Sequence, residues 1–133
     1  MPTITGFHHL SLTVRDATKS EQFYASAFGF VPVLELPDEE GRGFKRIIAH
    51  GESRTIIGFS VHADNDGSPF TEFRTGLDHL SFGVGSREEL DAWAAHLDGL
   101  GIEHSEIRTT PIGDLLTVRD PDNIQVELWT DRR

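Results

Sequence analysis

The chain repeats its own opening phrase. Residues 6–14 (GFHHLSLTV) return seventy positions later as residues 76–84 (GLDHLSFGV), and both copies fit G-x-x-H-L-S-x-x-V. A period this long, seen only twice, indicates a duplicated module and not a solenoid. A duplicated fold can bring two copies of one position together around a pseudo-twofold axis. The repeat therefore predicts a fold of two similar halves, with His9 and His79 as a symmetric pair.

The same offset holds to the end of the chain, with no net insertion. The turn at 50–53 falls on the turn at 120–123, and the apolar run 55–60 falls on 125–130. Each half is expected to form a strand, a helix and three further strands. We therefore predict an α+β fold, in which two tandem βαβββ modules form a curved sheet around a cleft.

The elements of each module follow from residue periodicity and capping signals. In the first module we expect strands at 9–14, 31–36, 44–49 and 55–61, and a helix that begins at Asp16 and ends at Gly29. In the second we expect strands at 79–84, 103–108, 115–119 and 124–129. Its helix should begin with the capping box of Ser86 and Glu89 and end at Gly99. The predicted inward residues of the two helices are Phe23, Ala27, Phe28, Leu90, Trp93, Leu97 and Leu100.

The length fits one compact domain with a real core. All 133 residues are assigned to that single domain: module 6–62, a linker at 63–76 (ADNDGSPFTEFRTG) and module 77–132. The linker is rich in the Gly, Pro, Asn and Asp residues that favour turns.

Charge and composition restrict the partners. The formal charge of −10 argues against nucleic acid or an anionic membrane as the main partner. No apolar stretch reaches the roughly 20 residues that span a bilayer, and no signal peptide is visible. There is no cysteine, and hence no disulfide framework or thiolate chemistry. Together these features favour a cytoplasmic protein with a small-molecule substrate.

Strand alternation predicts a metal site. His9 shares one strand face with Ser11 and Thr13, and His79 shares the matching face with Ser81. Glu127 is a carboxylate in a strand otherwise suited to a core, where an unpaired charge is costly. Together, His9, His79 and Glu127 would form a two-histidine, one-carboxylate site for one divalent first-row metal.

The repeat also predicts that the site is open. At the same offset the residue symmetric to Glu127 is Ile57, so a fourth protein ligand is missing. Three ligands with an open side are typical of catalytic metal sites. The same alternation predicts the residues that line the substrate pocket: Ser11, Thr13, Thr55, Ile57, Phe59, Ser81, Gln125 and Trp129. Phe59 and Trp129 form either apolar pocket walls or caps at the sheet edges. His8 is expected to point away from His9, at the surface or in a structural role.

The chain resembles the vicinal oxygen chelate superfamily, the group of glyoxalases, bleomycin-resistance proteins and extradiol dioxygenases. The motifs that carry the resemblance are residues 9–14 (HLSLTV), 23–30 (FYASAFGF), 77–82 (LDHLSF) and 120–127 (DPDNIQVE). The resemblance implies paired βαβββ modules, usually in a homodimer, and metal ligands at His9, His79 and Glu127. It leaves open whether one site is built within one chain or across two.

Departures from individual subgroups narrow the reaction. Glyoxalase I has a further glutamate where this chain has Ile57, which argues against that activity. Extradiol dioxygenases carry a tyrosine where Thr117 stands, and a histidine that the stretch 109–116 lacks. Fosfomycin-resistance transferases match at 9–14, but the tyrosine and basic residues that hold the phosphonate are not evident at 105–119.

Two classes of function remain after these comparisons. The leading hypothesis is a metalloenzyme, dioxygenase-, lyase- or transferase-like, that acts on a small oxygen-containing substrate with Fe, Mn, Zn or Ni. The alternative is a non-catalytic protein that binds or sequesters a small molecule, as bleomycin-resistance proteins do. A weaker third possibility is an accessory subunit that keeps the fold for dimer contacts.

Overall fold

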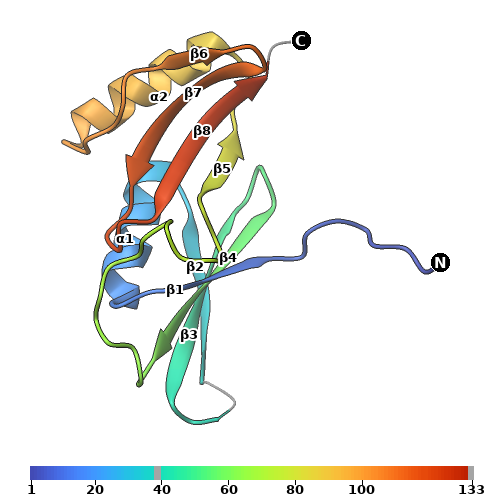
Figure 1. Cartoon of the computed structure of the whole chain (residues 1–133), viewed down its shortest axis with the longest axis vertical. Coiled ribbons are helices and arrows are strands. Elements are labelled where there is room, and N and C mark those ends of the chain that lie inside the picture. Colours follow the sequence, from blue (N-terminus) through green and yellow to red (C-terminus); the bar gives the residue numbers. More distant parts are fainter. Residues whose placement is uncertain (38–39, 132–133) are drawn as a thin grey trace. The chain divides into compact units, whose positions relative to one another are not determined.

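A computed structural model describes residues 1–37 and 40–131 of the chain. Its elements run strand, helix and three strands, twice over (Figure 1). Backbone contacts divide the chain into two compact units, Met1–Ser68 and Pro69–Arg133, and the division falls inside the predicted linker. The predicted α+β fold of two βαβββ modules is confirmed.

The first unit is a four-stranded sheet with one helix against it. Its elements are β1 (Leu10–Thr13), α1 (Ala17–Phe28), β2 (Val31–Pro37), β3 (Gly43–His50) and β4 (Thr55–His62). The strand order is β1-β4-β3-β2, with β1 parallel to β4 and the other pairs antiparallel. Tyr24 of α1 is fully buried, and its ring centroid lies 5.3 Å from that of Phe59. The core of this unit therefore lies between α1 and one face of the sheet.

The second unit has the same plan. Its elements are β5 (Leu80–Gly83), α2 (Arg87–Gly99), β6 (Arg108–Thr110), β7 (Gly113–Arg119) and β8 (Gln125–Asp131), with strand order β5-β8-β7-β6. Helix α2 lies along one side of this sheet (Figure 1). Leu90 and Leu97 of α2 are fully buried, together with Val126 of β8. The outer end of the predicted helical stripe is exposed, at Leu100.

The helix caps follow the sequence closely. The Asp16 side chain accepts a hydrogen bond from Lys19 N at 3.1 Å, and the Ser86 hydroxyl accepts one from Glu89 N at 3.2 Å. Gly29 ends α1 in the left-handed conformation, with φ 79°. Helix α2 ends at Gly99 as predicted, but its C-cap is Leu100, and the left-handed glycine that follows it is Gly101. No helix in the described ranges is long and apolar enough to cross a bilayer.

The strand predicted at 103–108 is wrong, because regular pairing begins only at Arg108. Upstream of it, His104 makes a single bridge to Val118. The Ser105 hydroxyl accepts the N–H of Thr117 at 2.9 Å and donates to the carbonyl of Glu106 at 2.8 Å. A serine side chain that bonds nearby backbone groups competes with a regular strand ladder.

The repeat does not keep one offset throughout, and the predicted equivalence of Ile57 with Glu127 is wrong. Leu10 pairs with Ile57 in the first unit, whereas Leu80 pairs with Val126 in the second. The strands β1 and β5 are thus related by an offset of 70, but β4 and β8 by an offset of 69. The residue equivalent to Glu127 is Gly58.

Two further observations support this register. Val14 N donates to the carbonyl of Ser60, and Val84 N donates to that of Trp129, which again relates β4 to β8 by 69. The two non-glycine residues with positive φ among those described, Arg54 (57°) and Asn123 (69°), also differ by 69. The second module is therefore one residue shorter than the first, and the deletion lies in the turn between β7 and β8, upstream of Asn123.

This shift moves three predicted pocket residues to the other face of the sheet. Side chains alternate along a strand, so Thr55, Ile57 and Phe59 share one face of β4. Phe59 is fully buried against Tyr24 of α1, and Ile57 is also buried. All three therefore point to the helix side, and Phe59 is not the counterpart of Trp129. The opposite face of β4 carries Ile56, Gly58, Ser60 and His62.

Candidate functional site

Glu127 lies in the middle of β8 and is only 6% exposed. Its Oε2 accepts a hydrogen bond from the Ser81 hydroxyl at 2.9 Å, and its Oε1 accepts one from the Gln125 amide nitrogen at 3.0 Å. Ser81 stands directly beside Glu127 in the parallel β5–β8 pair. The buried carboxylate is thus held by one donor on each oxygen, which offsets part of the cost of its burial.

His79 precedes β5 and faces Glu127. Its Nδ1 lies 2.6 Å from Oδ1 of Asp78, and its Nε2 lies 3.4 Å from Oε2 of Glu127. A carboxylate only accepts hydrogen bonds, so the contact with Asp78 assigns the ring proton to Nδ1. In the neutral ring, Nε2 then carries a lone pair that points toward a carboxylate oxygen. The second unit therefore brings together two of the three predicted metal ligands.

His9 stands at the equivalent place before β1 in the first unit. Its Nδ1 lies 2.8 Å from Nδ1 of His8, and the two rings meet edge to face with centroids 5.1 Å apart. His8 therefore contacts the His9 ring, which the prediction that it points away did not foresee. In both units the residue before the histidine contacts its Nδ1. This arrangement leaves Nε2 of each histidine for another partner.

The described residues contain no group of three or more His, Cys, Asp or Glu side chains that could hold a metal ion. His79 and Glu127 belong to the second unit and His9 to the first. The grouping of all three ligands therefore remains a prediction.

The position equivalent to Glu127 in the first unit is filled differently. The hydroxyls of Ser11 and Ser60 lie 3.0 Å apart beside Gly58. A Cβ atom on Gly58 would lie 3.3 Å from the Ser11 Oγ and 3.4 Å from Cδ1 of Ile47. The first distance is tight and the second is at the short end of ordinary van der Waals contact, so a side chain here would press on Ser11, where the other half of the repeat has its carboxylate.

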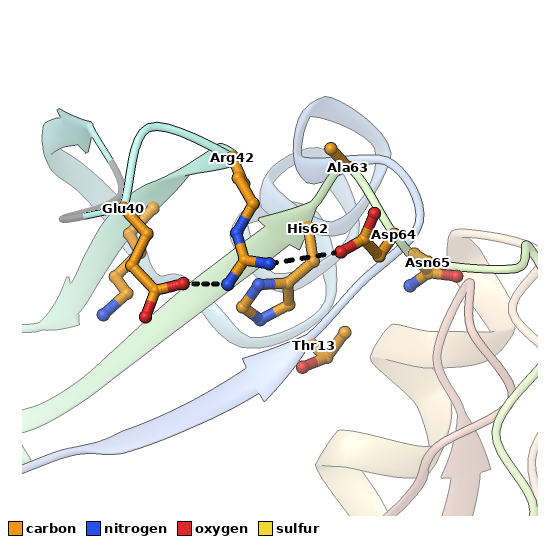
Figure 2. A pocket seen from close by; sticks show the side chains of 8 residues that line it. Thr13, Glu40, Arg42, His62, Ala63, Asp64 and Asn65 are labelled. Carbon is orange, nitrogen blue, oxygen red and sulfur yellow. Dashed lines mark hydrogen bonds and ion pairs between the residues drawn. The ribbon is translucent and has the colours of Figure 1, made fainter.

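The remaining predicted pocket residues lie on the same sheet faces as these groups. In the first unit Thr13 lines a hollow of about 520 Å³, together with Glu40, Arg42, Lys45, His62, Ala63, Asp64 and Asn65. Figure 2 shows Arg42 between two carboxylates of this hollow, Glu40 and Asp64, with which it forms exposed ion pairs. In the second unit, Ser81 and Trp129 line a hollow of about 470 Å³.

Sequence reasoning missed two contributors to the site of the second unit. Asp78, directly before the predicted ligand, fixes the tautomer of His79. Arg119 on β7 donates to the side-chain oxygen of Gln125 at 3.1 Å and so reaches the site through that amide. Asp78 could have been found from its place beside the histidine. Arg119 could not, because its contact depends on the register between β7 and β8.

Comparisons with known proteins agree with this architecture. Residues 6–128 match the model of the Glyoxalase/Bleomycin resistance protein/Dioxygenase superfamily. Protein YwkD of Bacillus subtilis (strain 168) is 34% identical over 128 residues, which covers 95% of this chain and 97% of YwkD.

Solved structures share the fold. The crystal structure of a glyoxylase/bleomycin resistance protein/dioxygenase domain from Frankia sp. EAN1pec is 29% identical, with a TM-score of 0.88 over 98% of this chain and 100% of that chain. The fosfomycin resistance protein FosX from Listeria monocytogenes, complexed with Mn(II) and a sulfate ion, is 21% identical, with a TM-score of 0.70 over 98% of this chain and 95% of that one. The sequence match, the two βαβββ modules and the relatives agree: the chain belongs to the Glyoxalase/Bleomycin resistance protein/Dioxygenase superfamily.

Proposed function

We propose that this protein is a divalent-metal-dependent enzyme that acts on a small oxygen-containing substrate, with His9, His79 and Glu127 as the metal ligands. The observation that carries the proposal is the contact between Nε2 of His79 and Oε2 of Glu127. The Asp78 carboxylate holds the proton of the neutral ring on Nδ1, so two acceptor atoms face each other at 3.4 Å. A buried carboxylate beside an imidazole nitrogen calls for a cation at this place, either a metal ion or a proton on Nε2.

A divalent metal suits this pair, because a hydrogen bond between Nε2 and Oε2 would be long at 3.4 Å. A neutral imidazole nitrogen and a carboxylate oxygen are both good ligands for first-row divalent ions. The outer nitrogen of a metal-binding histidine usually donates to a carboxylate or carbonyl, as Nδ1 of His79 does to Asp78. The hydrogen bond from His79 to Asp78 therefore also agrees with metal binding by His79.

The residues around the proposed metal would have separate roles. A divalent ion held here would supply Lewis acidity that polarises a substrate oxygen. Asp78 accepts a hydrogen bond from Nδ1 of His79, which leaves Nε2 as the ligand atom, and Ser81 and Gln125 fix the two oxygens of Glu127. Gly58 supplies no fourth ligand at the equivalent place in the other half of the repeat, which would leave a position open for substrate.

Relatives support a metal in this family. The FosX structure complexed with Mn(II) has the same fold, although at 21% identity it is no guide to the substrate of this chain. The present sequence and structure support a metal-dependent small-molecule enzyme, and they leave Fe, Mn, Zn and Ni all compatible with the ligand set.

The test is metal binding by the purified full-length protein. We expect wild type to retain about one equivalent of Mn(II), Fe(II), Zn(II) or Ni(II) after loading and dialysis, and its melting temperature to fall on chelation. His9→Ala, His79→Ala and Glu127→Gln should each lose the metal and the shift caused by chelation. His62→Ala, which removes an exposed histidine at the end of β4, serves as the matched control and should bind as wild type does. Equal, negligible retention by wild type and the three ligand variants would refute the proposal.

One observation favours the alternative, a non-catalytic binding protein. Apart from the proposed ligand His79, the side chains that contact Glu127 or flank it on its sheet face are Ser81, Thr117, Gln125 and Trp129, and none of these four titrates near neutral pH. Among these described neighbours, no general acid or base is evident beyond the ligands themselves. A turnover screen of the metal-loaded protein over catechols, hemithioacetals and epoxides separates the two functions. Metal binding and substrate binding without turnover would favour the sequestering protein.

A further inference from the structure

A chain of four polar side chains leads from the linker into the candidate metal site. Arg119 donates through Nη2 to Glu72 Oε1 at 3.0 Å and to Gln125 Oε1 at 3.1 Å. Gln125 in turn donates through Nε2 to Glu127 Oε1 at 3.0 Å. The carboxylate of Glu127 is therefore connected through two intermediates to Glu72, which precedes β5.

The direction of every hydrogen bond in this chain is fixed by chemistry. A guanidinium only donates, so the Gln125 atom that meets Arg119 has to be its oxygen. The amide nitrogen of Gln125 then faces Glu127 and can only donate to it. Because the oxygen and nitrogen of a glutamine are otherwise interchangeable in shape, Arg119 decides which of them Glu127 meets.

This arrangement leaves one oxygen of Glu127 for the site. Oε1 is taken by Gln125, whereas Oε2 points to His79 and receives the Ser81 hydroxyl. A carboxylate rotates about its last bond unless its oxygens are held, and Glu127 is held on both sides. Oε2 of Glu127 is thus oriented toward Nε2 of His79 before any metal binds.

The other half of the repeat lacks the whole chain. In the register of the strands, Arg119, Gln125 and Glu127 correspond to Ala49, Ile56 and Gly58. The β3–β4 pair forms with the same pattern as β7–β8 without any of the three polar groups. They are therefore not needed for strand pairing, and they occur together in the half that carries the carboxylate ligand.

We infer that Gln125 and Arg119 are positioning residues, which orient Glu127 as a metal ligand without touching the metal or the substrate. This inference rests on the proposed function, because it assigns a role toward the same metal. Outer hydrogen-bonding partners of metal ligands typically change metal affinity by roughly 10–100-fold when they are removed. We expect a loss of that size for Gln125.

The experiment measures Mn(II) affinity by calorimetry on the full-length protein, with the melting temperature of the metal-free protein as a second readout. Gln125→Met keeps the length of the side chain but removes its hydrogen bonds. It should weaken Mn(II) binding by about 10–100-fold, a larger loss than its lowered metal-free melting temperature accounts for, because Oε1 of the buried Glu127 also loses its donor. Gln125→Glu keeps an acceptor for Arg119 but turns an oxygen toward Glu127, so it should also bind Mn(II) weakly. Mn(II) binding by Gln125→Glu as tight as that of wild type would overturn the inference.

Two further variants separate positioning from general stability. Arg119→Met leaves the orientation of the Gln125 amide unfixed and should lower Mn(II) affinity by a smaller factor, which keeps the test available if Gln125→Met does not fold. The matched control is Arg46→Met on β3, which removes ion pairs to Glu21 and Glu35 in the other unit. It should lower the melting temperature without changing Mn(II) affinity.

The outcomes distinguish this inference from the proposed function. If wild type binds no Mn(II) or other divalent ion, both fail. If wild type binds and His79→Ala does not, but Gln125→Met and Arg119→Met bind as wild type does, the metal site stands and the positioning role is refuted. If the Mn(II) affinity of Gln125→Met and Arg119→Met falls only in proportion to the metal-free melting temperature, their effect is one of general stability. The positioning role is then likewise refuted.

Discussion

At the scale of single residues, the contacts of a histidine decide its role more than its presence does. His104 lies outside the candidate site, and both of its ring nitrogens meet acceptors. Nδ1 lies 2.7 Å from the carbonyl oxygen of Ser105, and Nε2 lies 2.9 Å from Oδ1 of Asp98. The bond to the Ser105 carbonyl, followed by the bond and charge of Asp98, raises the pKa of His104 above its ordinary value.

This raised pKa predicts a pH-dependent stability. A group that binds its proton more tightly in the folded protein stabilises it fully below the unfolded pKa, about 6.5 for histidine. That contribution is lost as the pH rises through the folded value. We expect the free energy of unfolding, measured in urea between pH 5.5 and 8.5, to fall more steeply toward high pH in wild type than in His104→Gln. Parallel curves for the two proteins would contradict this assignment.

The residues of the candidate metal site were partly predictable from the sequence. His79 and Glu127 follow from the repeat and from alternation along the strands, and the structure places them 3.4 Å apart. Asp78, Arg119 and the donor role of Gln125 depend on side-chain directions and on neighbours from other strands. Composition and spacing carry no such information.

At the scale of elements, the turn between β7 and β8 has the largest consequence. The side chain of Asp120 is buried, and its Oδ1 accepts the backbone N–H groups of Asp122 and Ile124, both at 2.9 Å. This turn is one residue shorter than its counterpart between β3 and β4. It sets the register that places Glu127, and not Val126, on the face of the sheet that carries Ser81.

Removal of the acceptor in this turn should destabilise the second unit. Asp120→Ala leaves two backbone donors without their partner, and each unsatisfied buried donor costs about 1–3 kcal/mol. We expect a loss of roughly 2–4 kcal/mol in the free energy of unfolding, allowing for partial hydration of the turn. Asp120→Asn retains a side-chain oxygen that can accept both bonds and should lose much less. Chemical denaturation of the two variants decides the matter, and equal losses would argue against the role of the Oδ1 acceptor.

Capping signals were the most reliable local predictions. Asp16 and Ser86 both accept the N–H three residues ahead, as their places in the sequence predicted. Such signals work because the donor and acceptor lie within one turn of the chain. The false strand at 103–108 shows the converse, since its pairing depends on Thr117, twelve residues beyond Ser105.

At the scale of the whole molecule, the chain is expected to form a homodimer, as its family resemblance implies. Val31, Val33 and Leu36 on the edge strand β2 are each about half exposed, at 56%, 55% and 46%. Exposed apolar side chains gathered on one strand favour association with another surface. Sedimentation equilibrium at micromolar concentrations should therefore give a mass near twice the 14.8 kDa of one chain. A single-chain mass across the whole concentration range would contradict the expectation.

The sequence by itself determined the duplication, the order of the elements, the helix caps and the identity of two facing side chains, His79 and Glu127, that are candidate metal ligands. These features depend on local periodicity and on residues that recur at a fixed spacing, so they can be read along the chain. Only the tertiary structure decided which residue of the first unit is equivalent to Glu127 of the second. When a turn loses one residue, every side chain on the strand that follows it moves to the other face of the sheet. For that reason the residue equivalent to Glu127 is Gly58 and not Ile57, and the predicted pocket residues of β4 lie on the helix side of the sheet. The hydrogen bonds that lead from Arg119 through Gln125 to Glu127 were also visible only in the structure.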